Sequence, residues 1–242
     1  MRGSRFYDDE SVRERYLAHR RGGARSPNVV MEEPAFLAAT GPLAGQDVVD
    51  LGCGDGAAAP LVMGLGAATY LGVDGSAGMI AAASERDAMP GVTFLREDIE
   101  DVRLEEDAFD LVMSRMALHY IASLGPVLVR IRSALRPGGR LIFTVSHPVI
   151  TSHDASSPGP RTNWVVDDYF VRGPRPRPWF SSTVTWHHRT IADYVSSVID
   201  HGFRIDAVDE CEPDATLLDG DADELQRRRR VPLILLVAAS AQ

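Results

Sequence analysis

A glycine-rich turn followed by a single acid is the part of this sequence that points most directly to chemistry. Gly52, Gly54 and Gly56 come directly after the apolar segment 47–51, and Asp74 ends the next apolar segment, eighteen positions after Gly56. Glycine lets the backbone pass close beneath a ligand because it has no Cβ. A carboxylate at the end of the second strand can accept hydrogen bonds from both hydroxyls of a ribose. The pairing therefore predicts a nucleoside-binding site.

The spacing of the glycines and the acids beside them indicate which nucleoside binds. A dinucleotide site has the spacing Gly-x-Gly-x-x-Gly, and the start of its helix receives a pyrophosphate. This chain has Gly-x-Gly-x-Gly instead, with Asp50 and Asp55 in and beside the turn. Carboxylates repel pyrophosphate but suit a cation that carries an ammonium and a sulfonium group. The turn therefore favours S-adenosylmethionine and argues against a dinucleotide-dependent oxidoreductase.

Five segments, in order, resemble the motifs of class I S-adenosylmethionine-dependent methyltransferases of the small-molecule type. The first contains the glycine turn, the second the ribose acid, and the third an acid and an apolar residue beside the adenine. The fourth and fifth resemble the motif of the fourth strand and the turn before the fifth. These segments are residues 48–56, 71–76, 97–99, 109–114 and 135–141. The resemblance extends over about residues 30–147.

The resemblance implies a position for each part of the cofactor. Asp50 would lie near the sulfonium, and Asp74 would hold the ribose hydroxyls. Asp98 would accept from the adenine amine, with Ile99 packed on the adenine face. Met79 either flanks the adenine or fills the core. The implied cofactor-binding set is Tyr16, Asp50, Gly52, Gly54, Gly56, Asp74, Gly75, Ser76, Met79, Asp98, Ile99, Ser114 and Met116.

Three histidines are candidates to remove a proton from the methyl acceptor. Histidine titrates near neutral pH, and open α/β sheets bind ligands at the carboxyl ends of their strands. His119 follows the predicted fourth strand and His147 the fifth, whereas His188 precedes a predicted helix. For His147 the alternative is a structural hydrogen bond in a proline turn. His19 and His201 are expected at the surface.

The resemblance also implies a reaction that needs no metal. Metal-dependent catechol-type methyltransferases place carboxylates after the fourth and fifth strands, and neither position has them here. Enzymes that methylate amino groups of nucleic-acid bases carry an Asn/Asp-Pro-Pro-aromatic run, where this chain has Ser-Arg-Met-Ala at 114–117. We expect an in-line displacement in which the protein aligns the nucleophile and, where needed, takes its proton. The cofactor product would be S-adenosylhomocysteine.

The elements that must position these residues alternate between strand and helix. Predicted strands are 47–51, 70–74, 92–95, 109–114 and 140–146, and predicted helices are 57–65, 76–86 and 120–135. This alternation predicts a doubly wound, parallel α/β sheet. A helix at 190–200 and strands at 203–208 and 232–239 follow, which by the resemblance complete a seven-stranded, mostly parallel, Rossmann-like sheet. Asn28 is the expected N-cap of a helix that precedes the sheet.

The chain is expected to form a single domain of four parts. Residues 1–40 would be an N-terminal helical lid, and 41–147 the cofactor-binding core. Residues 148–187 would be an insert without a sustained period that caps the substrate, and 188–242 the C-terminal helix and strand pair. Tyr7 could close the pocket from the N-terminal side.

The insert is rich in aromatic residues and arginine. An aromatic wall favours an aromatic or heteroaromatic substrate, and the arginines could bind a carboxylate or phosphate on it, with solvated side chains as the alternative. The aromatic residues are Trp164, Tyr169, Phe170, Trp179, Phe180 and Trp186, and the arginines are Arg161, Arg172, Arg175 and Arg177.

Composition limits the partners. A formal charge of −9 argues against a large nucleic-acid interface, and no apolar run approaches the roughly 20 residues of a membrane helix. The start of the chain lacks a secretion signal, and two cysteines form no disulfide framework, so we expect a cytoplasmic protein. The sequence leaves the oligomeric state open, a homodimer included.

The function expected from these observations is methyl transfer from S-adenosylmethionine to an oxygen, nitrogen or carbon atom of a small metabolite, as in natural-product biosynthesis. One alternative is a sensor or scaffold that binds S-adenosylmethionine without catalysis. Another is a methyltransferase that acts on tRNA or protein.

Overall fold

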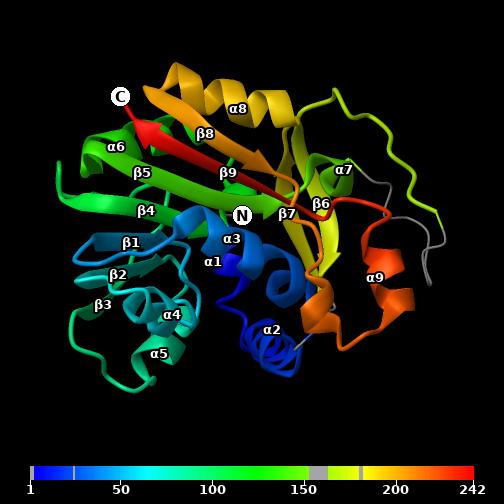
Figure 1. Cartoon of the computed structure of the whole chain (residues 1–242), viewed down its shortest axis with the longest axis horizontal. Helices are drawn as coiled ribbons and strands as arrows, with labels where there is room; N and C mark the ends of the chain where they lie inside the picture. Colours follow the sequence, from blue (N-terminus) through cyan, green and yellow to red (C-terminus); the bar gives the residue numbers. More distant parts are fainter. Residues whose placement is uncertain (1–2, 24, 153–162, 180–181) are drawn as a thin grey trace.

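The computed structural model describes residues 3–23, 25–152, 163–179 and 182–242 (Figure 1). Its main sheet has seven strands in the order β3-β2-β1-β4-β5-β9-β8. The first five strands are parallel, and β9 runs antiparallel to both β5 and β8. This confirms the predicted Rossmann-like, doubly wound sheet. The strands are β1 Asp47–Leu51, β2 Thr69–Asp74, β3 Val92–Arg96, β4 Phe109–Arg115, β5 Leu135–Ser146, β8 Phe203–Asp209 and β9 Ile234–Ala241.

Both faces of the sheet are buried, which explains why its central strands are apolar at nearly every position. Successive side chains of a strand point to opposite faces. Val49 and Val112 therefore belong to one hydrophobic core, whereas Val48 and Leu111 belong to the other. Helices α6 and α8 cover the first core, and α3 and α4 pack on the second (Figure 1).

The helices after β1 are shorter than the sequence predicts. The predicted helix 120–135 begins four residues late, as α6, and is preceded by the 3₁₀ turn η2, whereas the predicted helices 57–65, 76–86 and 190–200 begin one or two residues late. Within the described residues, no helix is both long and apolar enough to cross a bilayer. These elements are α4 Ala59–Gly64, α5 Ala77–Ser84, η2 Leu118–Tyr120, α6 Leu124–Ala134, α7 Pro148–Thr151, α8 Ile191–Asp200, η3 Ala215–Leu218 and α9 Ala222–Arg228.

The N-terminal segment is helical, as its pattern predicts, but it contains a π-turn. Its elements are α1 Gly3–Phe6, α2 Glu10–Gly22, the π-turn η1 Asn28–Glu32 and α3 Glu33–Thr40. The expected N-cap at Asn28 is wrong, because Pro27 occupies the cap position and makes no side-chain cap bond. Asn28 therefore lies inside the turn. Single π-turns occur frequently at functional sites because they alter which side chains share a face.

The insert contains a hairpin that the sequence analysis missed. Strand β6, Gly173–Trp179, pairs antiparallel with β7, Ser182–His188. Pro174, Pro176 and Pro178 alternate along β6. Because alternate residues of a strand turn their N–H groups toward opposite edges, the three prolines face away from β7 and the ladder keeps its donors.

A third hydrophobic cluster joins the N-terminal segment to this hairpin. Phe6 and Val12 from α1 and α2 are buried with Val184 and Trp186 of β7. Tyr7, Tyr120, Ile150 and Trp179 pack against this cluster. Segments more than 170 positions apart in the sequence therefore meet beside the carboxyl ends of the sheet strands.

Candidate functional site

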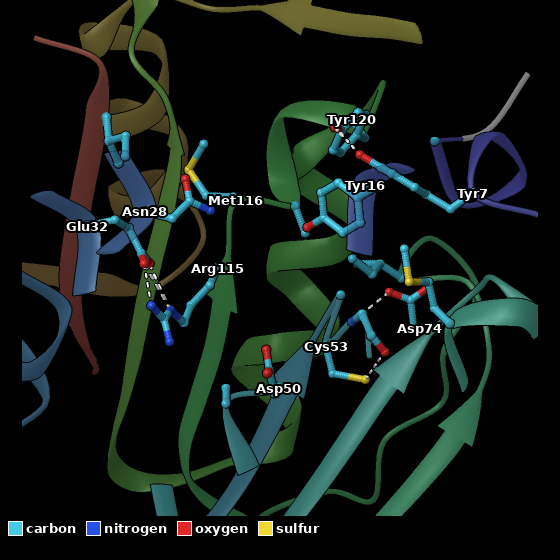
Figure 2. A pocket seen from close by; sticks show the side chains of 18 of the residues that line it. Tyr7, Tyr16, Asn28, Glu32, Asp50, Cys53, Asp74, Arg115, Met116 and Tyr120 are labelled. Carbon is cyan, nitrogen blue, oxygen red and sulfur yellow. Dashed lines mark hydrogen bonds and ion pairs between the residues drawn. The ribbon is translucent and has the colours of Figure 1, made fainter. Parts of the chain in front are cut away.

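A cavity of about 530 Å³ lies at the carboxyl ends of β1, β2 and β4, where doubly wound sheets bind ligands. Figure 2 shows Asp50, Cys53 and Asp74 on one side of it and the tyrosines on another. Most residues of the expected cofactor-binding set line this cavity. They are Tyr16, Asp50, Gly52, Gly54, Asp74, Gly75, Met79, Asp98, Ile99 and Met116.

The carboxylate of Asp74 is held in place by the glycine turn. Its Oδ2 accepts the backbone N–H of Gly54 at 3.0 Å, and its Oδ1 accepts the N–H of Ser76 at 2.9 Å. Burial raises the pKa of Asp74, although the two backbone donors favour its charged form. An acid fixed in this way can accept hydrogen bonds from a vicinal diol without first being reordered.

The floor of the cavity depends on a glycine at position 52. Gly52 has a φ of +85°, and a Cβ there would overlap the Cβ of Ala117. Beside it, the Asp50 carboxylate accepts a hydrogen bond from the Tyr70 hydroxyl at 2.6 Å and is only 2% exposed. Burial, followed by the charge of Asp50, raises the pKa of Tyr70 well above its usual value, so its hydroxyl stays a donor.

A buried ion-pair cluster forms the adjoining wall. Arg115 at the end of β4 donates from Nε to Glu32 Oε1 at 2.9 Å, and its Nη2 pairs with Glu32 Oε2 and with Glu33 at 3.3 Å. Burial disfavours the charge of Arg115, but Glu32, Glu33 and Asp50 together raise its pKa. Three carboxylates around one guanidinium leave this end of the cavity with excess negative charge. A cationic ligand compensates such an excess.

Three tyrosines form another wall. The hydroxyls of Tyr7 and Tyr120 are 2.9 Å apart, and the Tyr7 ring centroid lies 4.9 Å from that of Tyr16 (Figure 2). Burial raises the pKa of Tyr120 to about 12 and that of Tyr7 well above its usual value. Both phenols are therefore neutral near pH 7 and present flat, apolar faces with polar tips.

Comparison with known proteins identifies the family. A family model described as a methyltransferase domain matches residues 49–143. A solved S-adenosylmethionine-dependent methyltransferase from Mesorhizobium loti is 33% identical, with a TM-score of 0.79 over 89% of this chain and 98% of that one. The chain belongs to the S-adenosylmethionine-dependent methyltransferases.

Two further matches agree with this family. A solved structure from Listeria monocytogenes is 33% identical, covering 86% of this chain and 96% of its own, with a TM-score of 0.78. The trans-aconitate 2-methyltransferase of Deinococcus radiodurans is 38% identical over 111 residues, which cover 46% of this chain and 40% of that enzyme. The charge of the cavity also agrees with this family, because its excess negative charge suits the positively charged sulfonium of the cofactor.

Three residues of the expected cofactor-binding set lie behind the cavity wall of this methyltransferase. A Cβ on Gly56 would lie 2.6 Å from the Phe94 ring, so its lack of a side chain serves packing. The Ser76 hydroxyl accepts from the N–H of Met79 and thereby caps α5. Ser114 Oγ donates to Leu51 O at 2.7 Å, which ties β4 to β1. These three residues support the lining and do not belong to it.

The three histidines expected to contact substrate do not line the cavity. Burial lowers the pKa of His119 to about 3, and its Nδ1 accepts the N–H of Ser146 at 3.3 Å. His147 caps α7, as the alternative interpretation expects, and its Nε2 contacts Glu210 at 3.0 Å. His188 is fully buried, and its Nε2 hydrogen-bonds the carbonyl of Tyr169. The strand ends place His119 and His147 at the correct edge of the main sheet, but all three histidines are buried in packed structure.

Other lining residues were not expected from the sequence. His19 lines the cavity from α2, although it is exposed as predicted. Asn28 and Glu32 reach it from the π-turn, and Arg115 from the end of β4 (Figure 2). The π-turn leaves no distinct mark in residue type, so the sequence signal for Asn28 and Glu32 is weak. Arg115 follows directly after the fourth motif, which is a signal that could have found it.

The arginines of the insert are occupied elsewhere. Arg172 pairs with Asp193 at 2.9 Å, Arg175 donates to the carbonyl of Val171, and Arg177 to that of Ile150. None of these three lines the cavity. Arg161 and Phe180 lie outside the described residues.

Among the aromatic residues of the insert that the structure describes, Trp179 lines the cavity together with Ile150. Trp164 instead donates to the carbonyl of Val149 at 3.2 Å. Within the described ranges, no group of three or more His, Cys, Asp or Glu residues is arranged to hold a metal ion.

Proposed function

We propose that this methyltransferase acts on a small, planar molecule that binds between the N-terminal helices and the hairpin of the insert. One observation carries the proposal. The cavity that holds the glycine turn and Asp74 continues to a second region lined by Tyr7, Tyr120 and Trp179. A single continuous cavity lets a methyl donor and a flat acceptor meet without leaving water between them.

Cofactor binding is proposed for the lining residues of the expected set. Asp74 would hold the ribose, Asp98 and Ile99 the adenine, and Asp50 the cationic methionine end. When bound, S-adenosylmethionine supplies a methyl group that the sulfonium has already activated. Gly52 and Gly54 would let the backbone lie close beneath it.

The chemistry of the acceptor region favours a neutral, flat substrate. Its aromatic walls can bury planar rings, and Arg172, Arg175 and Arg177 of the insert do not line the cavity. We therefore infer that the substrate does not depend on the insert arginines for an anionic group. The tyrosine and tryptophan faces would orient the acceptor atom toward the methyl group, which is the main contribution a methyltransferase makes to rate.

Proton removal is assigned to a residue of the lining. His19 takes the place of His119, His147 and His188 as the candidate proton acceptor, because among these four histidines only His19 lines the cavity. His19 is exposed to solvent, so water could carry the proton away.

Fractionation of a cell extract tests the proposal. The extract is separated by ultrafiltration at about 3 kDa, and each fraction is incubated with enzyme and S-adenosylmethionine. We expect S-adenosylhomocysteine to form with the filtrate and not with the retained macromolecules. Formation only with the retained fraction, abolished by ribonuclease or protease, would establish tRNA or protein as the substrate. Binding of S-adenosylmethionine without turnover in any fraction would favour a sensor.

A further inference from the structure

Glu32 begins a chain of hydrogen bonds that ends at the backbone of the cavity wall. The residue belongs to the N-terminal π-turn, outside the segment that the methyltransferase domain matches, yet its side chain is 1% exposed. Its Oε1 accepts from Arg115 Nε and from Thr144 Oγ1, each at 2.9 Å. The Thr144 Oγ1 in turn accepts the backbone N–H of Met116 at 3.1 Å.

The chemistry of the three groups fixes the direction of this chain. An ionised carboxylate only accepts, so the single hydroxyl hydrogen of Thr144 must point to Glu32. The lone pairs of that oxygen are then turned toward the N–H of Met116. Because Thr144 is fully buried, no bulk water competes for these groups.

The backbone at the end of this chain has an unusual conformation. Met116 has a φ of +56°, a region that residues other than glycine seldom adopt. Its N–H also bonds the carbonyl of Thr144 at 2.9 Å, so two acceptors of one residue hold it. The next residue, Ala117, packs directly against Gly52 of the glycine turn. Met116 and Ala117 both line the cavity.

We propose that Glu32 and Thr144 are positioning residues for the cofactor site. They hold Met116 in its left-handed conformation, which seats Ala117 against Gly52 and sets the width of the cofactor cradle. The N-terminal π-turn and the glycine turn are thereby coupled through side chains that do not need to touch the adenosyl group. The proposal rests on cofactor binding in this cavity, which titration of the wild-type protein tests separately.

Removal of the Thr144 hydroxyl tests the proposal without leaving Arg115 unpaired. T144V replaces the hydroxyl by a methyl group of similar size, T144S keeps the hydroxyl, and S84A removes a hydroxyl that bonds the carbonyl of Ile80 on an exposed part of α5. Calorimetric titration with S-adenosylhomocysteine gives the dissociation constant of each. Hydrogen exchange of the 115–117 amides reports the backbone, and the thermal midpoint without ligand reports the fold.

We expect T144V to bind S-adenosylhomocysteine about fivefold more weakly, the effect of one lost hydrogen bond, with faster exchange at 115–117. T144S and S84A should bind as the wild type does. Circular dichroism checks that T144V is folded, and T144A, which also lacks the hydroxyl, takes its place if it is not.

Unchanged affinity in the hydroxyl-free variant would overturn the proposal, as would equal weakening in T144V and T144S. A lower thermal midpoint of T144V without a change in affinity would leave Thr144 a purely structural role and would also overturn it. A wild-type protein that binds no S-adenosylhomocysteine would overturn the cofactor site itself, and this proposal with it.

Discussion

The hydroxyl of Tyr7 lies 2.9 Å from the hydroxyl of Tyr120, and this bond joins the N-terminal segment to the 3₁₀ turn η2 in the wall of the cavity. A buried neutral hydrogen bond contributes about 1 kcal/mol. We expect Y7F and Y120F each to release S-adenosylhomocysteine about fivefold faster in stopped-flow displacement, and the double variant no faster than either. Additive effects would show that the two hydroxyls act independently.

Asp74 is expected to be the acid that the cofactor requires most. In D74N an amide NH₂ must face one of the two backbone donors, Gly54 N–H or Ser76 N–H, and the charge is lost. Hydrogen bonds to charged groups contribute about 1.5–3 kcal/mol, so S-adenosylhomocysteine affinity should fall about 10- to 100-fold. Asp107, an exposed acid away from the cavity, provides the matched control D107N. Calorimetry that gives the same affinity for both variants would remove Asp74 from the site.

Alanine substitutions at Gly52 and Gly45 distinguish the effect of steric crowding from that of backbone strain. Both have positive φ, +85° and +72°, but a Cβ at 45 would meet no atom within 4 Å, whereas one at 52 would overlap Ala117. We expect G45A to lower the free energy of unfolding by about 1 kcal/mol through backbone strain alone, and G52A to lower it by more because the overlap with Ala117 adds to that strain. Only G52A should also weaken S-adenosylhomocysteine binding, by about tenfold or more. Equal binding by the two variants would contradict the close approach at Gly52.

His19 should affect turnover more than binding. Once a substrate fraction is in hand, H19A is expected to lower kcat about 100-fold or more, with the dissociation constant of S-adenosylhomocysteine unchanged. The control is H201A, whose imidazole Nδ1 bonds the carbonyl of Ser197. A wild-type pH–rate profile in H19A would mean that the acceptor loses its proton to water or to another group.

His119 should make the protein less stable in acid. Burial lowers its pKa to about 3, whereas the unfolded chain takes up this proton near pH 6.5. Between these values only the unfolded state is protonated, so lowering the pH from 7 to 5 costs about 2 kcal/mol of unfolding free energy. H119N keeps an acceptor for Ser146 N–H, and urea unfolding at both pH values should show a dependence weaker by that amount. An equally steep dependence would contradict a neutral buried His119.

The core of the fold could be predicted because each local signal agreed with the next. The apolar strand 47–51, the glycine turn and Asp74 are specified by residues close together in sequence, and the sheet brings them together as expected. Ser114 and Ser76 were placed correctly along the chain. Their side chains, however, turn toward backbone partners behind the wall, which only the packed structure determines.

The histidines and the hairpin show where such reasoning ends. Its position after a strand places His119 at the correct edge of the sheet. Its ring is nevertheless buried, because it packs against Trp186 and accepts a hydrogen bond from the Ser146 N–H. The hairpin was not predicted because proline usually indicates the end of a strand. Prolines at alternate positions are nevertheless compatible with an edge strand, because their nitrogens all face away from the partner strand. Glu32 was not predicted as a residue of the site because its partners, Arg115 and Thr144, are more than 80 positions away in the sequence.

The alternating prolines of β6 have a consequence for how molecules of this protein meet one another. A strand from a second molecule could extend the hairpin at its β6 edge only by pairing with the outward-facing backbone groups of β6. Pro174, Pro176 and Pro178 have no N–H to offer there, so that edge cannot template intermolecular sheet growth. The β6 edge of the hairpin is thus protected against intermolecular strand pairing, because proline has no backbone N–H whatever the solution conditions.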